Sequence, residues 1–254
     1  MPSAVKKDKE LSSKGLVTIL MERQGADEAA LEGFLWMKFP DCDAFACVNG
    51  AVPTPSSGGL PNGALIGVDG KLLWWGNPIR DAKKVEELIA VELDKVKKGW
   101  GDTAEARKVR QALYGKSNFA AALAVVQAMP EGDARTALQL EIDTRYASRK
   151  KSVTALQEDG RWDRAHDLAK ELVKGVGRHE PWASEAAELL ATFATENGKA
   201  ELSLDGKLAK VIKPLRDGNG EGAPKRLEAF LKGAEGSKVG ARAQRILTAL
   251  RTNL

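Results

Sequence analysis

The sequence predicts an α/β domain followed by an all-α domain. Up to about residue 99, short β-branched runs alternate with helical patterns, which is typical of an α/β region. Within it an Asp-Gly pair at 69–70 separates two apolar runs, which is a strong hairpin signal. From residue 100 onward every segment has apolar residues at helical spacing. We therefore predict domains over residues 1–99 and 100–254.

The first domain is predicted to contain a strand, a helix, a short strand or loop, a hairpin and a last helix. The run GLVTILM from Gly15 is β-branched and bounded by turn residues, so it indicates a buried strand. A helix then begins at Asp27 or Gly25, with acidic residues in its first turn, and Pro40 ends it. The predicted ranges are 16–21, 27–39, 44–48, 64–68, 71–76 and 79–98.

The second domain is predicted to be a series of helices over 102–114, 117–129, 133–158, 161–176, 183–197, 202–215, 221–233 and 237–252. Phe119 and Trp162 are each followed three positions later by alanine, and GEGAPKRLEAFLKG is a weaker third copy. The pattern resembles the helical pairs of tetratricopeptide arrays, although these two aromatics lie 43 residues apart instead of about 34. Both aromatics are expected in the core between helices.

Charge and hydropathy argue against two classes of partner. The net charge of +4 is small for a nucleic-acid-binding protein, and the one tight basic run, residues 149–151, is expected to be a solvated helix face. No window approaches the roughly 18 apolar residues of a membrane span. We therefore expect no nucleic-acid and no membrane partner for this chain.

Two segments resemble the thioredoxin-like family of redoxins and thiol-disulfide oxidoreductases. LPNGALIGVDGKLLWWGNP, residues 60–78, is similar to the segment around that family's cis-proline and hairpin. SSKGLVTILMERQGADEAALEGFLWMKF, residues 12–39, is similar to the strand and helix that follow the reactive helix. The resemblance covers about residues 1–98. It implies a thioredoxin-like fold, protein thiols or disulfides as partners, and no cofactor.

The resemblance also implies a substrate-binding loop at Leu60, Pro61 and Asn62. Pro61 would be the cis-proline of the family, which leaves the backbone of Leu60 exposed so that an extended substrate can pair with it as an added strand. The alternative is an ordinary trans proline that starts a strand.

The chain departs from the family at the reactive motif. Redox-active members carry Cys-x-x-Cys at the start of a helix, where the thiol pKa is lowered, and that position would precede Met1 here. The central strand is missing too, which would leave two strand edges unpaired. A shortened N-terminus, another segment filling the gap, or direct pairing of strands 16–21 and 64–68 would explain this, and we expect the first. The compartment stays open, the bacterial cell envelope being one candidate.

Cys42 and Cys47 are the two cysteines of the sequence and hence the candidate catalytic residues. If the segment is extended, their Cα atoms lie about 16 Å apart and their side chains point to opposite faces. Two unrelated thiols are therefore the alternative to a catalytic or resolving pair. With His166 and His179 predicted in the other domain, no metal site is expected.

Two functions follow from these residues. The first is a thioredoxin-like protein of redox ancestry, related to thiol-disulfide oxidoreductases, that lacks their reactive motif and carries a helical interaction module. Catalysis, if present, would proceed by attack of a thiolate on a substrate disulfide. The second is a redox-inactive protein-binding module that uses the helical array and the Pro61 loop. Trp74 and Trp75 are expected on opposite sides of their strand, so one of them is a candidate contact with the helical domain, and we expect both to pack in a core.

Overall fold

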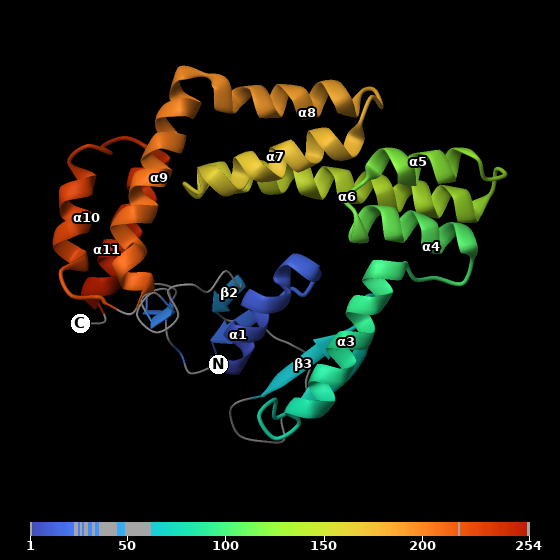
Figure 1. Ribbon diagram of the computed structural model, residues 1–254, viewed down its shortest axis with the longest axis horizontal. Helices are drawn as coiled ribbons and strands as arrows, with labels where there is room; N and C mark the ends of the chain where they lie inside the picture. Colours follow the sequence, from blue (N-terminus) through green and yellow to red (C-terminus); the bar gives the residue numbers. More distant parts are fainter. Residues whose placement is uncertain are drawn as a thin grey trace. The chain divides into compact units, whose positions relative to one another are not determined.

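The structure is a computed structural model that describes residues 2–22, 25, 27, 30–31, 34–35, 45–48, 62–217 and 219–252. It is mostly helical (Figure 1), and an α/β region is followed by an all-α region. The chain forms two compact units, which we call unit 1 (Met1–Glu28 and Cys42–Lys116) and unit 2 (Ala29–Asp41 and Ser117–Leu254). The division into domains 1–99 and 100–254 stays a prediction from the sequence pattern.

Unit 1 contains the strands. Its elements are α1 (Pro2–Leu11), η1 (Ser12–Lys14), β1 (Ile19–Glu22), β2 (Phe45–Val48), β3 (Gly63–Ile66), β4 (Leu72–Gly76), α3 (Ala82–Lys98), α4 (Ala104–Arg110) and the π-helical turn η2 (Gln111–Gly115). β1 and β2 pair in parallel, and β3 and β4 pair antiparallel as the predicted hairpin. In the described residues β1 and β3 belong to separate sheets, so the alternative that these two strands pair directly is wrong there.

The predicted helix over 27–39 lies mostly outside the described residues. Four of its positions are described as helical: Ala30, Leu31, Phe34 and Leu35. The run over 44–48, predicted to be a short strand or a loop, forms the strand β2 at Phe45–Val48. The strand predicted from residue 16 begins only at Ile19.

Helix α3 holds the hairpin through two carboxylates. The Trp74 side chain is 7% exposed, and its indole Nε1 donates a hydrogen bond to Asp81 Oδ2 at 3.2 Å, just before α3 begins. At the turn, the backbone N–H of Val68 donates to the buried Glu92 at 2.9 Å. Trp75 lies on the other side of the strand and is 41% exposed, so the expectation of a core position is wrong for Trp75.

The joint between α3 and α4 is close-packed. Gly99 has φ +80°, and a Cβ there would lie 1.9 Å from the carbonyl oxygen of Arg107, so this approach needs glycine. Arg110 donates to the carbonyl oxygen of Trp100 at 3.2 Å, and its guanidinium carbon lies 5.6 Å from the centre of the indole ring. Residues 99–101 are thus a rigid joint within unit 1.

Unit 2 is a series of helices that pack on their neighbours. They are α5 (Phe119–Gln127), α6 (Asp133–Glu158), α7 (Trp162–Val176), α8 (Trp182–Ala191), η3 (Thr192–Ala194), α9 (Glu196–Arg216), α10 (Ala223–Leu231) and α11 (Lys238–Thr252). Helix α6 contacts α5 and α7, α7 contacts α8 and α9, and α9 contacts α10 and α11 (Figure 1). Phe119 and Trp162 are 1% and 7% exposed, which confirms their predicted core positions.

One predicted helix boundary in unit 2 is wrong. The helix expected over 183–197 ends as α8, because Thr192–Ala194 is a 3₁₀ turn. The hydroxyl of Thr195 then accepts a hydrogen bond from the backbone N–H of Gly198 at 3.0 Å. This cap starts α9 at Glu196, several residues before the predicted start at 202.

Two buried carboxylates of α9 cap other helices. Glu201 accepts hydrogen bonds from the backbone N–H groups of Lys238 and Val239 at 2.8 and 3.1 Å, which satisfies the start of α11. Asp205 accepts from the backbone N–H of Asp163 at 2.9 Å in the first turn of α7, and it forms an ion pair with Arg242 at 3.1 Å. Helix α9 therefore ties α7 and α11 together.

Candidate functional site

The residues predicted from the family resemblance lie mostly outside the described part of the chain. Cys42, Leu60 and Pro61 are not described. Cys47 lies within β2, opposite Met21 in the parallel pair. Asn62 is exposed and precedes β3, and its side-chain oxygen accepts a hydrogen bond from the backbone N–H of Gly63 at 3.0 Å. The assignments of Cys42 and Cys47 as catalytic, and of Leu60, Pro61 and Asn62 as substrate-binding, stay predictions.

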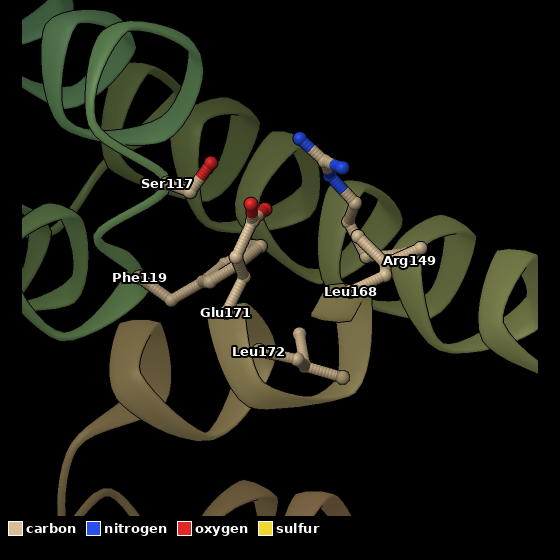
Figure 2. A pocket seen from close by; sticks show the side chains of 6 residues that line it. All are labelled: Ser117, Phe119, Arg149, Leu168, Glu171 and Leu172. Carbon is tan, nitrogen blue, oxygen red and sulfur yellow. The ribbon is translucent and has the colours of Figure 1, made fainter. Parts of the chain in front are cut away.

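A shallow hollow lies on the surface of unit 2 at the start of α5 (Figure 2). Its lining is Phe119, Leu168 and Leu172, with Ser117, Arg149 and Glu171 as the polar members. Figure 2 shows the polar ends of these last three side chains pointing to the same side. The empty space of about 170 Å³ includes open solvent, so the hollow is a surface depression and does not enclose a ligand as ordinary ligand pockets do.

The backbone at the hollow is fixed by close packing. Ser117 has φ +50°, which is uncommon for a residue with a side chain. Its carbonyl oxygen would lie 2.2 Å from a Cβ placed on Gly175, so α7 can approach it only because residue 175 is glycine. The side chain of Asn118 then caps α5 by accepting from the backbone N–H of Ala121 at 2.9 Å.

An aromatic cluster beside the hollow joins α5, α6 and α8. The rings of Tyr146 and Trp182 stack with centroids 4.3 Å apart, and Phe119 meets both edge-on at 5.9 and 6.3 Å. The Tyr146 hydroxyl donates towards Glu185 at 3.1 Å, and Lys150 donates to the same carboxylate at 2.6 Å. The cluster is a satisfied packing unit that holds Phe119 in place.

The polar end of this cluster shifts two pKa values in opposite directions. Burial raises the pKa of the Tyr146 phenol, and its hydrogen bond to Glu185 raises it further. The hydrogen bond from Lys150 lowers the pKa of Glu185, and the one from Tyr146 acts in the same direction. At neutral pH the arrangement is therefore a neutral phenol and an ammonium group around a carboxylate.

We expect the Tyr146 phenol to ionise only as the protein unfolds in alkali. Its raised pKa means that the folded state keeps the proton more tightly than the unfolded state, so its contribution to stability falls as the pH rises above the ordinary phenol pKa of about 10. Absorbance at 295 nm measures the phenolate. In a titration to high pH followed also by circular dichroism, this absorbance should show a second rise at the pH at which the protein unfolds. Tyr146→Phe should remove that second rise. Full ionisation of both tyrosines of the sequence in a still-folded protein would contradict this.

The histidines and acids of the described residues do not form a further centre. His166 lies against Phe193, with ring centroids 4.9 Å apart, and His179 meets Trp182 edge-on at 5.3 Å. Among the residues that the structure describes, no three His, Cys, Asp or Glu side chains are grouped so that they could hold a metal ion. None of the described helices has the length and apolar character that crossing a membrane requires.

The hollow was not predicted from the sequence. The sequence predicts a solvated face for residues 149–151, but Arg149 is half-buried in the lining of the hollow, and Lys150 is half-buried and paired with Glu185. The prediction holds only for Lys151. The sequence signal that could have indicated the hollow is Gly175, because an isolated glycine within a helical pattern indicates that another part of the chain approaches the helix closely.

No family model, no curated protein and no solved structure matches this chain. The likeness to thioredoxin-like proteins therefore stays a prediction from the residues.

Proposed function

We propose that the chain is a thioredoxin-like protein of redox ancestry, related to thiol-disulfide oxidoreductases, that carries a helical interaction module. The observation that carries the proposal is the strand arrangement of unit 1. A parallel pair, β1 with β2, is followed by an antiparallel hairpin, β3 with β4, and then by helix α3, which bonds to that hairpin. This is the order that the resemblance implies for the later part of a thioredoxin-like domain.

The placement of Cys47 argues against efficient turnover by this chain. A reactive thiol gains its low pKa at a helix N-terminus or beside a cation. Cys47 instead lies inside the parallel pair of β1 and β2, and the sequence contains no Cys-x-x-Cys. Protein thiols and disulfides remain the proposed substrates of the ancestral chemistry, which proceeds through a mixed disulfide.

We expect this chain not to accelerate the reduction of insulin by dithiothreitol. The measurement is the rate of insulin precipitation with the 254-residue chain, with its Cys42→Ser variant and with its Cys47→Ser variant, each beside dithiothreitol alone. All four rates should agree. An acceleration that disappears in either variant would place the redox centre at that cysteine and would overturn the expectation of an inactive chain.

The same placement of Cys47 favours a second candidate, a redox-inactive protein-binding module. In this proposal unit 2 supplies the binding surface, because α5 to α8 pack in sequence, α9 packs on α7, α10 and α11, and the helices so present successive outer faces. The Pro61 loop would add a backbone edge for an extended segment. This candidate predicts that the chain has no thiol-disulfide activity and still binds a protein through unit 2.

A further inference from the structure

The central acidic side chains of α9 are buried, whereas its lysine side chains are exposed. Its two central acidic residues, Glu201 and Asp205, are 4% and 6% exposed because they cap α11 and α7. Its lysines at 199, 207, 210 and 213 are all exposed. The sequence of the helix is therefore mixed in charge, whereas its outer face between Glu196 and Asp217 carries positive charge alone.

Three of these lysines have no partner in the described residues. Lys213 forms an ion pair with Asp217 at 2.5 Å, but no hydrogen bond or ion pair to a described residue holds Lys199, Lys207 or Lys210. At about 100° per residue these three fall within a sector of about 80°, and at 1.5 Å per residue they span about 17 Å. Ser203 lies within this sector, and Gly206 lies about 20° outside it, beside Lys199 and Lys210. We call the three lysines with these two residues the α9 lysine face.

Gly206 keeps one edge of the α9 lysine face open. A Cβ at this position would meet nothing within 4 Å, so no contact of the fold requires glycine there. Glycine inside a helix costs about 1 kcal/mol relative to alanine. Ser203, about one turn earlier, is small and exposed, whereas Gly206 is partly buried. Together they leave the helix backbone accessible for close approach of another helix, with ammonium groups on both sides.

We propose that the α9 lysine face binds an acidic helix of a partner protein. Charge complementarity selects the partner, because three unpaired ammonium groups face outward and no acidic side chain lies between them. The length of the face matches about three helical turns. Glu196 and Asp217 lie at the two ends of this helix face, and they would repel a longer continuous polyanion, which favours a short acidic helix over a nucleic acid.

The test is fluorescence anisotropy with a labelled helical peptide, two copies of Ala-Glu-Ala-Ala-Glu-Ala-Ala, at low ionic strength. The control peptide has Gln in place of Glu. We expect the acidic peptide to bind and the control peptide not to bind. Binding should weaken at 0.5 M salt, because exposed charges are screened.

Two variants locate the binding. The double variant Lys207→Glu with Lys210→Glu should weaken binding of the acidic peptide at least tenfold. The matched control is Lys151→Glu with Lys174→Glu, two exposed lysines on other helices of unit 2, and it should change binding less than twofold. Gly206→Gln should weaken binding at least fivefold while its Tm stays at or above that of the wild type, because the added side chain occupies open space and favours the helix.

Equal binding of the acidic peptide by the wild type and the Lys207→Glu, Lys210→Glu variant would overturn the proposal. So would tighter binding of a 12-nucleotide dT strand that the same variant abolishes, since the partner would then be a nucleic acid. The inference does not depend on thiol chemistry, because all of these variants lie in unit 2, and insulin reduction tests the redox proposal separately.

Discussion

Asp205→Ala is expected to lower the free energy of unfolding by about 3–5 kcal/mol, because it removes one partner of a buried ion pair. The side chains of Asp205 and Arg242 are 9% and 12% exposed. Burial lowers the pKa of Arg242, and Arg161 lowers it further, while Asp205 opposes this shift. Without Asp205 the guanidinium stays charged and keeps only its hydrogen bond to the carbonyl oxygen of Gly160 at 3.4 Å, without a paired carboxylate. The backbone N–H of Asp163 also loses its acceptor.

Urea unfolding followed by circular dichroism at 222 nm measures this loss. Asp217→Ala is the matched control, since Asp217 is exposed and pairs with Lys213 on the surface, and it should cost less than about 1 kcal/mol. The double variant Asp205→Ala with Arg242→Leu should recover part of the loss, because it no longer buries an unpaired charge. If Asp205→Ala alone lowers the free energy of unfolding by less than about 1 kcal/mol, the ion pair of Asp205 with Arg242 does not join α9 to α11 as described.

The parts of the fold that depend on local pattern could be predicted from the sequence. The hairpin follows from its Asp-Gly turn, and the helix predicted over 133–158 coincides with α6. The boundary between η3 and α9 could not be predicted, because Asn197 and Gly198 are turn signals that argue against a helix start. In the structure Gly198 lies inside the first turn of α9, where its missing side chain admits the carbonyl oxygen of Thr192.

The hollow and the α9 lysine face depend on contacts between helices, so local pattern does not show them. Arg149 and Glu171 come from α6 and α7, and only the packing of those helices brings them to one surface. Glu201 and Asp205 have the spacing of ordinary surface acids on a helix. Their burial follows from the backbone N–H groups of α11 and α7, which no feature of the α9 sequence indicates.

Gly198→Ala and Gly206→Ala are expected to change stability in opposite directions, although both replace a glycine of α9. At position 198 the new Cβ would lie 2.2 Å from the carbonyl oxygen of Thr192 and 2.8 Å from the Cα of Phe193, so the backbone between η3 and α9 must move. Overpacking of this kind costs about 1–3 kcal/mol. At position 206 the Cβ meets nothing within 4 Å, and alanine should stabilise the helix by about 0.5–1 kcal/mol.

The comparison of these two variants separates packing from helix propensity, because they share a helix, a residue type and a substitution. Thermal unfolding should show a lower Tm for Gly198→Ala and a higher Tm for Gly206→Ala than for the wild type. If both variants raise Tm, the carbonyl oxygen of Thr192 does not lie as close to Gly198 as the structure places it. If both lower it, Gly206 makes a contact that keeps glycine there for the fold, and the α9 lysine face loses the open position that Gly206 is proposed to provide.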